Sequence, residues 1–279
     1  MTGSVADQID GREFARTLLS HDIVDLSIAL DECLPCAWPR HAGYQHSIFN
    51  WFEALERTPA DAHDRLGAYY TATLHMDEHS GTHIDAPAHH IPPSQSGLPH
   101  ATPAGDTTAE KVDLRQTVGP ARVIDVRHLA GTTEPGISPM VSAEDLRKFE
   151  AEHGPVIDGD IVLLLTGWDS HIVPGAAGNA YAADPLQQRT PGWPAPSDDF
   201  LEALQQRGVR TLGTDAPSCG STHDGAAAHY TGLGAGMVFI EAMGNLAALP
   251  PTGATAIFLG LKIVGGSGAP GRAIGLVPK

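Results

Sequence analysis

The stretch HSGTHIDAPAH, residues 79–89, decides how this part of the chain folds. Its three histidines and its aspartate all lie at odd-numbered positions: His79, His83, Asp85 and His89. Successive side chains of a strand point to opposite faces, so an extended stretch would direct these four to one face, whereas a helix would scatter them. Residues four apart on a flat strand are separated by roughly 13 Å, too far to bind one ion. We therefore predict a bend at Gly81 and a change of direction at Pro87.

These side chains indicate a metal site. Imidazole nitrogens and a carboxylate on one face of a bent segment are common ligands of divalent ions, and without a cysteine among them Zn²⁺ and Mn²⁺ are both suitable. The alternative is that the cluster simply reflects a chain with 15 histidines, whose rings are solvated or satisfied by hydrogen bonds in the core. The shared facing and the glycine bend favour the metal site.

Composition and charge exclude several classes of protein. The chain has 279 residues, 42% of them apolar, and a formal net charge of −16 from 33 acidic and 17 basic residues. Such a charge repels nucleic acid, and the sequence shows neither a run of about 18 apolar residues nor a signal peptide, so no membrane partner is expected. Three cysteines, Cys33, Cys36 and Cys219, favour a reducing compartment. We predict a soluble cytoplasmic protein in which Cys33 and Cys36 are ordinary thiols.

Apolar patterning predicts an α/β fold with a strand-rich core. Helices are expected at 142–154 and 197–209, each with a serine at its start and a glycine near its end. Residues 170–197 are rich in Gly, Pro and Ala and are expected to form a surface excursion or a lid, and the glycines of 232–236 are expected in a turn. We predict a single domain over 1–279 with an N-terminal extension over 1–21. Strands are expected at 22–30, 121–126, 159–168, 236–246 and 256–266.

The stretch 79–89 resembles the His-x-Gly-Thr-His-x-Asp-x-Pro-x-His signature of the cyclase-like metal-dependent hydrolases, the family of the bacterial kynurenine formamidase and isatin hydrolase type. Every fixed position of the signature matches. The resemblance implies a swivelling β/β/α-type fold and a homo-oligomer, either a dimer or a dimer of dimers. Segments similar to other elements of the family lie at 25–30, 159–168, 213–218 and 229–246.

The resemblance also implies a role for each site residue. One or two divalent ions per subunit, Mn²⁺ or Zn²⁺, would be held by His79, His83, Asp85, His229 and Glu241. His89 would be the catalytic acid and base for a metal-activated water that attacks an amide or cyclic amide C–N bond. The substrate would be a small aromatic or cyclic molecule, such as an isatin-like lactam or an N-formyl aryl amine. Its contacts would be Trp51, Phe52, Trp168 and Ser218.

Other functions are compatible with parts of the sequence. Lactone-opening enzymes of the same broad family make C–O cleavage an alternative to C–N cleavage. His83, Asp85 and His229 also satisfy the two-histidine, one-carboxylate pattern of non-haem Fe(II) oxygenases, although this leaves His79 and His89 without a role. A serine hydrolase is disfavoured because the chain has no Gly-x-Ser-x-Gly stretch. A non-catalytic metal-binding protein would explain the ligands but not a separate His89.

Overall fold

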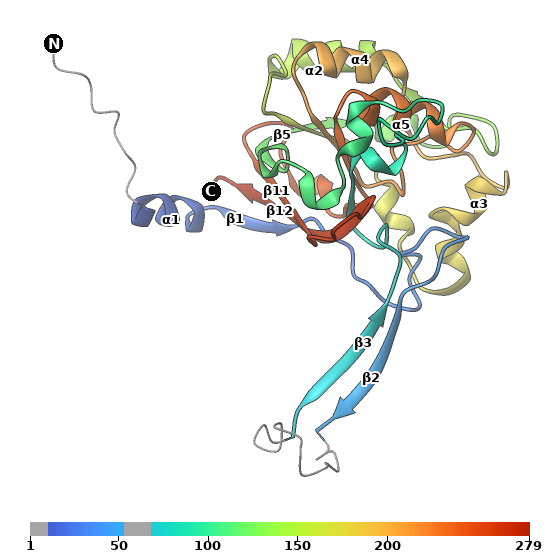
Figure 1. Cartoon of the computed structure of the whole chain (residues 1–279). Helices are drawn as coiled ribbons and strands as arrows, with labels where there is room; N and C mark the ends of the chain where they lie inside the picture. The colour runs from blue at the N-terminus through green and yellow to red at the C-terminus, as the bar shows by residue number, and fades with distance from the viewer. Residues whose placement is uncertain (1–10, 53–67) are drawn as a thin grey trace.

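A closed sheet forms the centre of the protein (Figure 1). The computed structural model describes residues 11–52 and 68–279. Neighbouring strands follow the order β12, β11, β5, β7, β9, β10 and β4, and the sheet closes because β4 also pairs with β12. The strand-rich α/β core predicted from the sequence is confirmed. The strands are β4 (His83–Asp85), β5 (Val118–Asp125), β7 (Ile161–Leu165), β9 (Thr211–Thr214), β10 (Val238–Glu241), β11 (Thr255–Gly260) and β12 (Gly268–Val277).

The two faces of the sheet pack against different apolar clusters. Along the fully buried β7, Leu163 belongs to a cluster with Val123 and Phe258. Its neighbour Leu164 points to the opposite face and packs in a second cluster with Phe200 of a covering helix. Burial on both faces explains why this segment reads as a continuous apolar run rather than an alternating one.

Three helices cover one face of the sheet: α2 (Ala143–His153), α4 (Asp198–Gln206) and α5 (Gly225–Gly234). The first two were predicted. Ser142 precedes α2, where its N–H is bonded to the Asp145 carboxylate, and Gly154 ends it with a φ of 84°. The predicted turn at 232–236 is wrong in part, because Gly232–Gly234 form the last residues of α5.

A two-stranded hairpin projects away from the body of the protein (Figure 1). It consists of β2 (Gln45–Trp51) and β3 (Tyr70–His75), and the residues between 52 and 68 lie outside the described part of the chain. Its apolar side chains are largely exposed, among them Ile48 and Phe49. At the N-terminal end, α1 (Gly11–Leu19) leads into β1 (Asp22–Asp25), which pairs with the last part of β12.

The segment 170–197 is only partly a surface excursion. Tyr181 and Trp193 are 2% and 0% exposed, so they anchor the segment in a third apolar cluster.

Within the described ranges, no helix combines the length and apolar character needed to cross a membrane. The remaining elements are β6 (Met140–Val141), β8 (Ala195–Pro196), α3 (Ala183–Leu186) and short 3-10 helices at Pro87–His89, Pro103–Asp106, Ala109–Lys111, Leu114–Gln116, Arg127–Leu129, Trp168–His171, Gly175–Ala180 and Leu246–Ala248.

Candidate metal centre

A tight turn joins β3 to β4 and bends as the sequence predicted. Gly81 has a φ of 63°, in the left-handed region that glycine adopts without strain. Its N–H donates to the carbonyl oxygen of Cys36 at 2.6 Å. The next residue, Thr82, donates through Oγ1 to the carbonyl oxygen of Ala242 at 2.6 Å. The turn is therefore attached both to the loop near Cys36 and to the end of β10.

Strand β4 presents two of the predicted ligands on one face. His83 and Asp85 are two positions apart on the strand, and Nε2 of His83 lies 3.4 Å from Oδ1 of Asp85. Antiparallel pairing with β10 places Glu241 opposite His83, with 3.6 Å between Oε2 and Nε2. Backbone pairing thus brings together two carboxylates and an imidazole from distant parts of the sequence.

Helix α5 supplies His229. Its Nε2 lies 3.5 Å from Oδ2 of Asp85 and 3.6 Å from Oε1 of Glu241. Nδ1 of His229 is bonded to the carbonyl oxygen of Gly225, and Nδ1 of His83 to that of Gly81. A carbonyl oxygen can only accept, so both Nδ1 atoms carry the proton and both Nε2 atoms present a lone pair to the carboxylates when the rings are neutral.

Opposite charges dominate the electrostatics of this cluster. Burial disfavours the charged forms of His83 and His229, but the neighbouring Asp85 and Glu241 carboxylates outweigh burial and raise the pKa of each histidine to about 10. Burial and the Asp85 charge oppose ionisation of Glu241, yet His229 and His83 lower its pKa to about 2. The pKa of Asp85 is likewise held below its ordinary range despite burial. Both carboxylates are therefore ionised, which is the form that binds metal.

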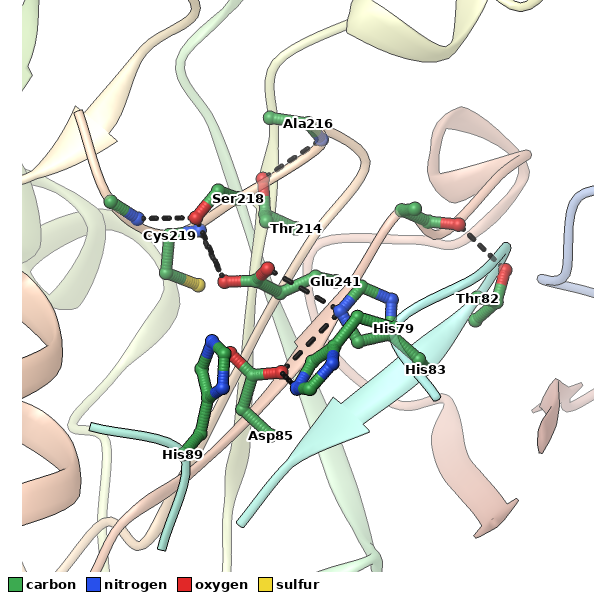
Figure 2. Close-up of polar contacts among 12 residues, drawn as sticks. His79, Thr82, His83, Asp85, His89, Thr214, Ala216, Ser218, Cys219 and Glu241 are labelled. Carbon is green, nitrogen blue, oxygen red and sulfur yellow. Dashed lines mark hydrogen bonds and ion pairs between the residues drawn. The ribbon is translucent and has the colours of Figure 1, made fainter. Parts of the chain in front are cut away.

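Three buried atoms in the cluster fit a divalent ion. Nε2 of His79 and both carboxylate oxygens of Asp85 have no hydrogen-bond partner among the described residues. Buried carboxylate oxygens that accept no hydrogen bond are costly, and a cation would satisfy these lone pairs. Figure 2 shows the side chains of His79, His83, Asp85 and Glu241 pointing toward one another. Nitrogen and oxygen donors of this kind suit Zn²⁺ and Mn²⁺.

His89 lies at the side of this cluster. It ends the 3-10 helix that begins at Pro87, so the change of direction predicted at Pro87 is confirmed. Its Nε2 is 4.0 Å from Oδ2 of Asp85, and its ring centroid is 4.1 Å from that of His79. Burial lowers the pKa of His89, which favours a neutral imidazole. A neutral ring beside the cluster can accept a proton.

A cavity of about 340 Å³ opens onto the histidines. Ser218 lines it, and the Ser218 hydroxyl lies 3.3 Å from Oε1 of Glu241, which also accepts the N–H of Cys219 at 2.6 Å (Figure 2). Its apolar wall includes Trp38 and Tyr181. The segment 170–197 therefore contributes to the cavity as well as to the surface.

Three aromatic residues that were predicted to contact the substrate do not line this cavity: Trp51, Phe52 and Trp168. Trp51 and Phe52 are 58% and 59% exposed at the far end of the projecting hairpin. Trp168 is buried behind the cavity, where its Nε1 donates to the carbonyl oxygen of Tyr181 and its ring packs against Trp193. Trp168 thus supports the segment that forms the wall.

The structure also brings to the cavity residues that the sequence interpretation missed: Trp38, His41, His90 and Tyr181. His90 stacks on His229 with 4.2 Å between ring centroids. Burial and the neighbouring histidines lower its pKa to about 4. Its position directly after His89 was a usable signal, whereas nothing in the local sequence marked Trp38 or Tyr181.

Comparison with known proteins identifies the family to which this chain belongs. The putative cyclase family matches residues 24–221. The chain belongs to this family. Among curated relatives of this chain, the isatin hydrolase of Roseibium aggregatum is 32% identical over 209 residues, covering 73% of each chain. The kynurenine formamidase of Salinibacter ruber is 29% identical over 256 residues, covering 90% of this chain and 96% of its own. The structure of isatin hydrolase A from Ralstonia solanacearum superposes on this protein with a TM-score of 0.77 at 26% identity, over 99% of this chain and 100% of that one.

Proposed function

We propose that this protein is a metal-dependent hydrolase that cleaves an amide or cyclic amide C–N bond other than a peptide bond. The observation that carries the proposal is the set of buried, unpaired atoms on His79 and Asp85, which face further ligand atoms and adjoin a cavity. The relatives named isatin hydrolase and kynurenine formamidase support the same class of reaction.

Five residues would hold the metal. His79, His83 and Asp85 would bind a first ion, and His229 and Glu241 would share Asp85 around a second. The distances of 3.4 to 3.5 Å from Asp85 oxygens to Nε2 of His83, His79 and His229 support this sharing. When bound, a divalent ion makes hydroxide available near neutral pH and polarises a carbonyl oxygen. We propose Mn²⁺ or Zn²⁺, with one or two ions per subunit.

His89 would move the proton. Hydrolysis adds water across the C–N bond: the oxygen bonds to the carbonyl carbon, and the departing nitrogen takes up a proton. The neutral imidazole of His89 would accept the proton of the attacking water and then deliver it to that nitrogen. Its partly exposed side chain, 26% accessible, adjoins the cavity that would contain the substrate.

The cavity supports a small planar substrate. Its wall combines Trp38 and Tyr181 with Pro35 and Pro217, and its volume of about 340 Å³ suits one or two fused rings. We therefore propose an isatin-like lactam or imide, or an N-formyl aryl amine. Ser218 would contact the substrate from the side of Glu241.

We propose further that the protein is a homo-oligomer, either a dimer or a dimer of dimers. Trp51, Phe52 and Tyr70 cluster on the hairpin, with ring centroids 4.8 to 6.3 Å apart, and each is at least 41% exposed. An exposed aromatic cluster on a projecting arm is characteristic of a subunit contact. Trp51 and Phe52 would contact a substrate only in the cavity of a neighbouring subunit.

The test is metal-dependent hydrolysis. The protein is stripped of metal, reloaded with Zn²⁺ or Mn²⁺, and assayed by ultraviolet absorbance with isatin, N-formylkynurenine and an aromatic lactone. We expect turnover only in the loaded protein, and a loss of about 10² to 10⁴-fold in kcat for His89→Ala with the metal retained. The exposed His128→Ala serves as control. Absence of turnover on both amides in a metal-loaded protein would contradict the proposal, and turnover on the lactone alone would move it to C–O cleavage.

A further inference from the structure

Asp77 lies between two histidines in the turn before β4. Its Oδ1 is 3.2 Å from Nδ1 of His79 and also accepts the backbone N–H of His79 at 2.9 Å. Its Oδ2 is 3.3 Å from Nδ1 of His41, which lines the cavity. The carboxylate therefore connects a candidate metal ligand to the cavity wall.

The contact with Asp77 determines which nitrogen of His79 can bind metal. A carboxylate only accepts hydrogen bonds, so Nδ1 of His79 carries the proton and Nε2 presents its lone pair. That Nε2 is the buried, unpaired atom, 3.5 Å from Oδ1 of Asp85. His83 and His229 are oriented by neutral carbonyl oxygens, whereas His79 is oriented by a negative charge.

Gly268 confines the same ring from its other side. A Cβ atom at Gly268 would lie 2.6 Å from Nε2 of His79 and 2.8 Å from its Cδ2. The ring thus packs directly on the backbone of β12, while Asp77 holds its opposite edge. These two contacts leave Nε2 directed toward Asp85.

We infer that Asp77 is a positioning residue for the metal centre, which orients His79 and fixes its tautomer. The inference rests on the metal site of the proposed function. His41 is the second partner of the same carboxylate, and Gly81 is bonded to Cys36, so the wall segment 36–41 is attached at two points to the turn that carries the ligand. Loss of Asp77 would leave the His79 ring free to change its orientation. Loss of His41 would loosen only the attachment of the wall segment 36–41.

The test measures metal affinity directly. Zn²⁺ dissociation constants are determined by chelator competition for the wild type, Asp77→Asn and the control Glu78→Gln. Glu78 is the adjacent carboxylate, but it bonds to Ser267 rather than to a histidine ring. We expect Asp77→Asn to weaken Zn²⁺ binding by about 10 to 100-fold and Glu78→Gln to retain wild-type affinity. Nitrogen-15 spectra of the histidine rings should show a single Nδ1–H tautomer for His79 in the wild type and a mixture in Asp77→Asn.

His41→Ala separates positioning from general loosening of the loop. We expect it to raise KM while Zn²⁺ affinity stays at the wild-type value. Equal losses of affinity in His41→Ala and Asp77→Asn, or unchanged affinity and an unchanged tautomer in Asp77→Asn, would overturn the inference. A wild-type protein that binds Zn²⁺ but hydrolyses nothing would contradict only the proposed function, because affinity and tautomer are measured without turnover.

Discussion

Oδ2 of Asp85 lies 3.5 Å from Nε2 of His229, which joins a strand near the first third of the chain to a helix near its end. The other oxygen of Asp85 faces His83 and His79 at 3.4 and 3.5 Å. One carboxylate therefore contacts every histidine proposed as a ligand. Asp85 is the group on which the whole centre depends.

Asp85→Asn should remove metal binding from both proposed positions. The amide keeps the size of the side chain but loses the negative charge and one acceptor atom. We expect an affinity loss of at least about 100-fold, at or beyond the upper end of what outer-sphere partners contribute. Metal content after dialysis is the measurement, with the exposed carboxylate variant Asp106→Asn as control. Stoichiometric metal in Asp85→Asn would disprove the shared role.

Trp38→Ala should impair substrate binding without affecting the metal. Removing the indole eliminates an aromatic wall of the cavity. We expect KM to rise by about tenfold, the equivalent of about 1.4 kcal/mol of lost contact, while metal content stays unchanged. Trp38→Phe keeps an aromatic face and should restore most of the affinity. Identical KM values for the alanine and phenylalanine variants would show that the ring does not face the substrate.

Gly268→Ala should weaken metal binding through His79. The added methyl group would lie 2.6 Å from Nε2 of His79, closer than any tolerated contact, so the ring must move. Gly43→Ala is the matched control, because a Cβ there meets nothing within 4 Å. Chelator competition should show reduced affinity for Gly268→Ala alone. Wild-type affinity in that variant would mean that His79 can shift without cost.

Glu150→Gln should destabilise the fold in a pH-dependent way. Nε and Nη2 of Arg207 donate to the two Glu150 oxygens at 2.6 Å each, which joins α4 to α2. This contact lowers the pKa of Glu150 below its ordinary value of 4.5. The stabilisation is therefore present above pH 4.5 and is lost as the pH falls through the folded-state pKa.

Urea unfolding measures this effect. We expect Glu150→Gln to lose about 1 kcal/mol of unfolding free energy at pH 7, and less as the medium is acidified below pH 4.5. Glu144→Gln removes an exposed pair with Arg147, 49% and 64% accessible, and should change little at any pH. If the difference in unfolding free energy between the wild type and Glu150→Gln stays constant down to pH 3, the ionised Glu150 carboxylate is not the source of that difference.

Local sequence patterns were sufficient to predict those structural features that depend on the backbone preferences of single residues. The bend at Gly81 and the ends of α2 and α4 follow from backbone preferences of single residues, and all were predicted. Helix α5 was missed because glycines have low helix propensity. Its Gly232 packs where a Cβ would lie 2.3 Å from the Phe239 ring, so tertiary packing selects glycine within a helix.

The cavity wall could not be predicted from local sequence. Trp38 and Tyr181 come from segments far apart in the chain that meet only in the folded protein. Trp168 was predicted to contact substrate because it stands at the end of a strand, and its ring packs in an apolar cluster with Tyr181 and Trp193. Aromatic residues carry no sequence signal that separates these two environments.

Strand β4 is three residues long, yet it is paired along its whole length on both sides: His83 opposite Glu241 and Pro270, and Asp85 opposite Phe239 and Gly268. Neither ligand can move along the strand without breaking ladders to two neighbours. The distance between them is consequently a property of the backbone and not of the ion. Exchange of one divalent ion for another would change how tightly the centre binds its ion, while the protein backbone around the ion stays the same.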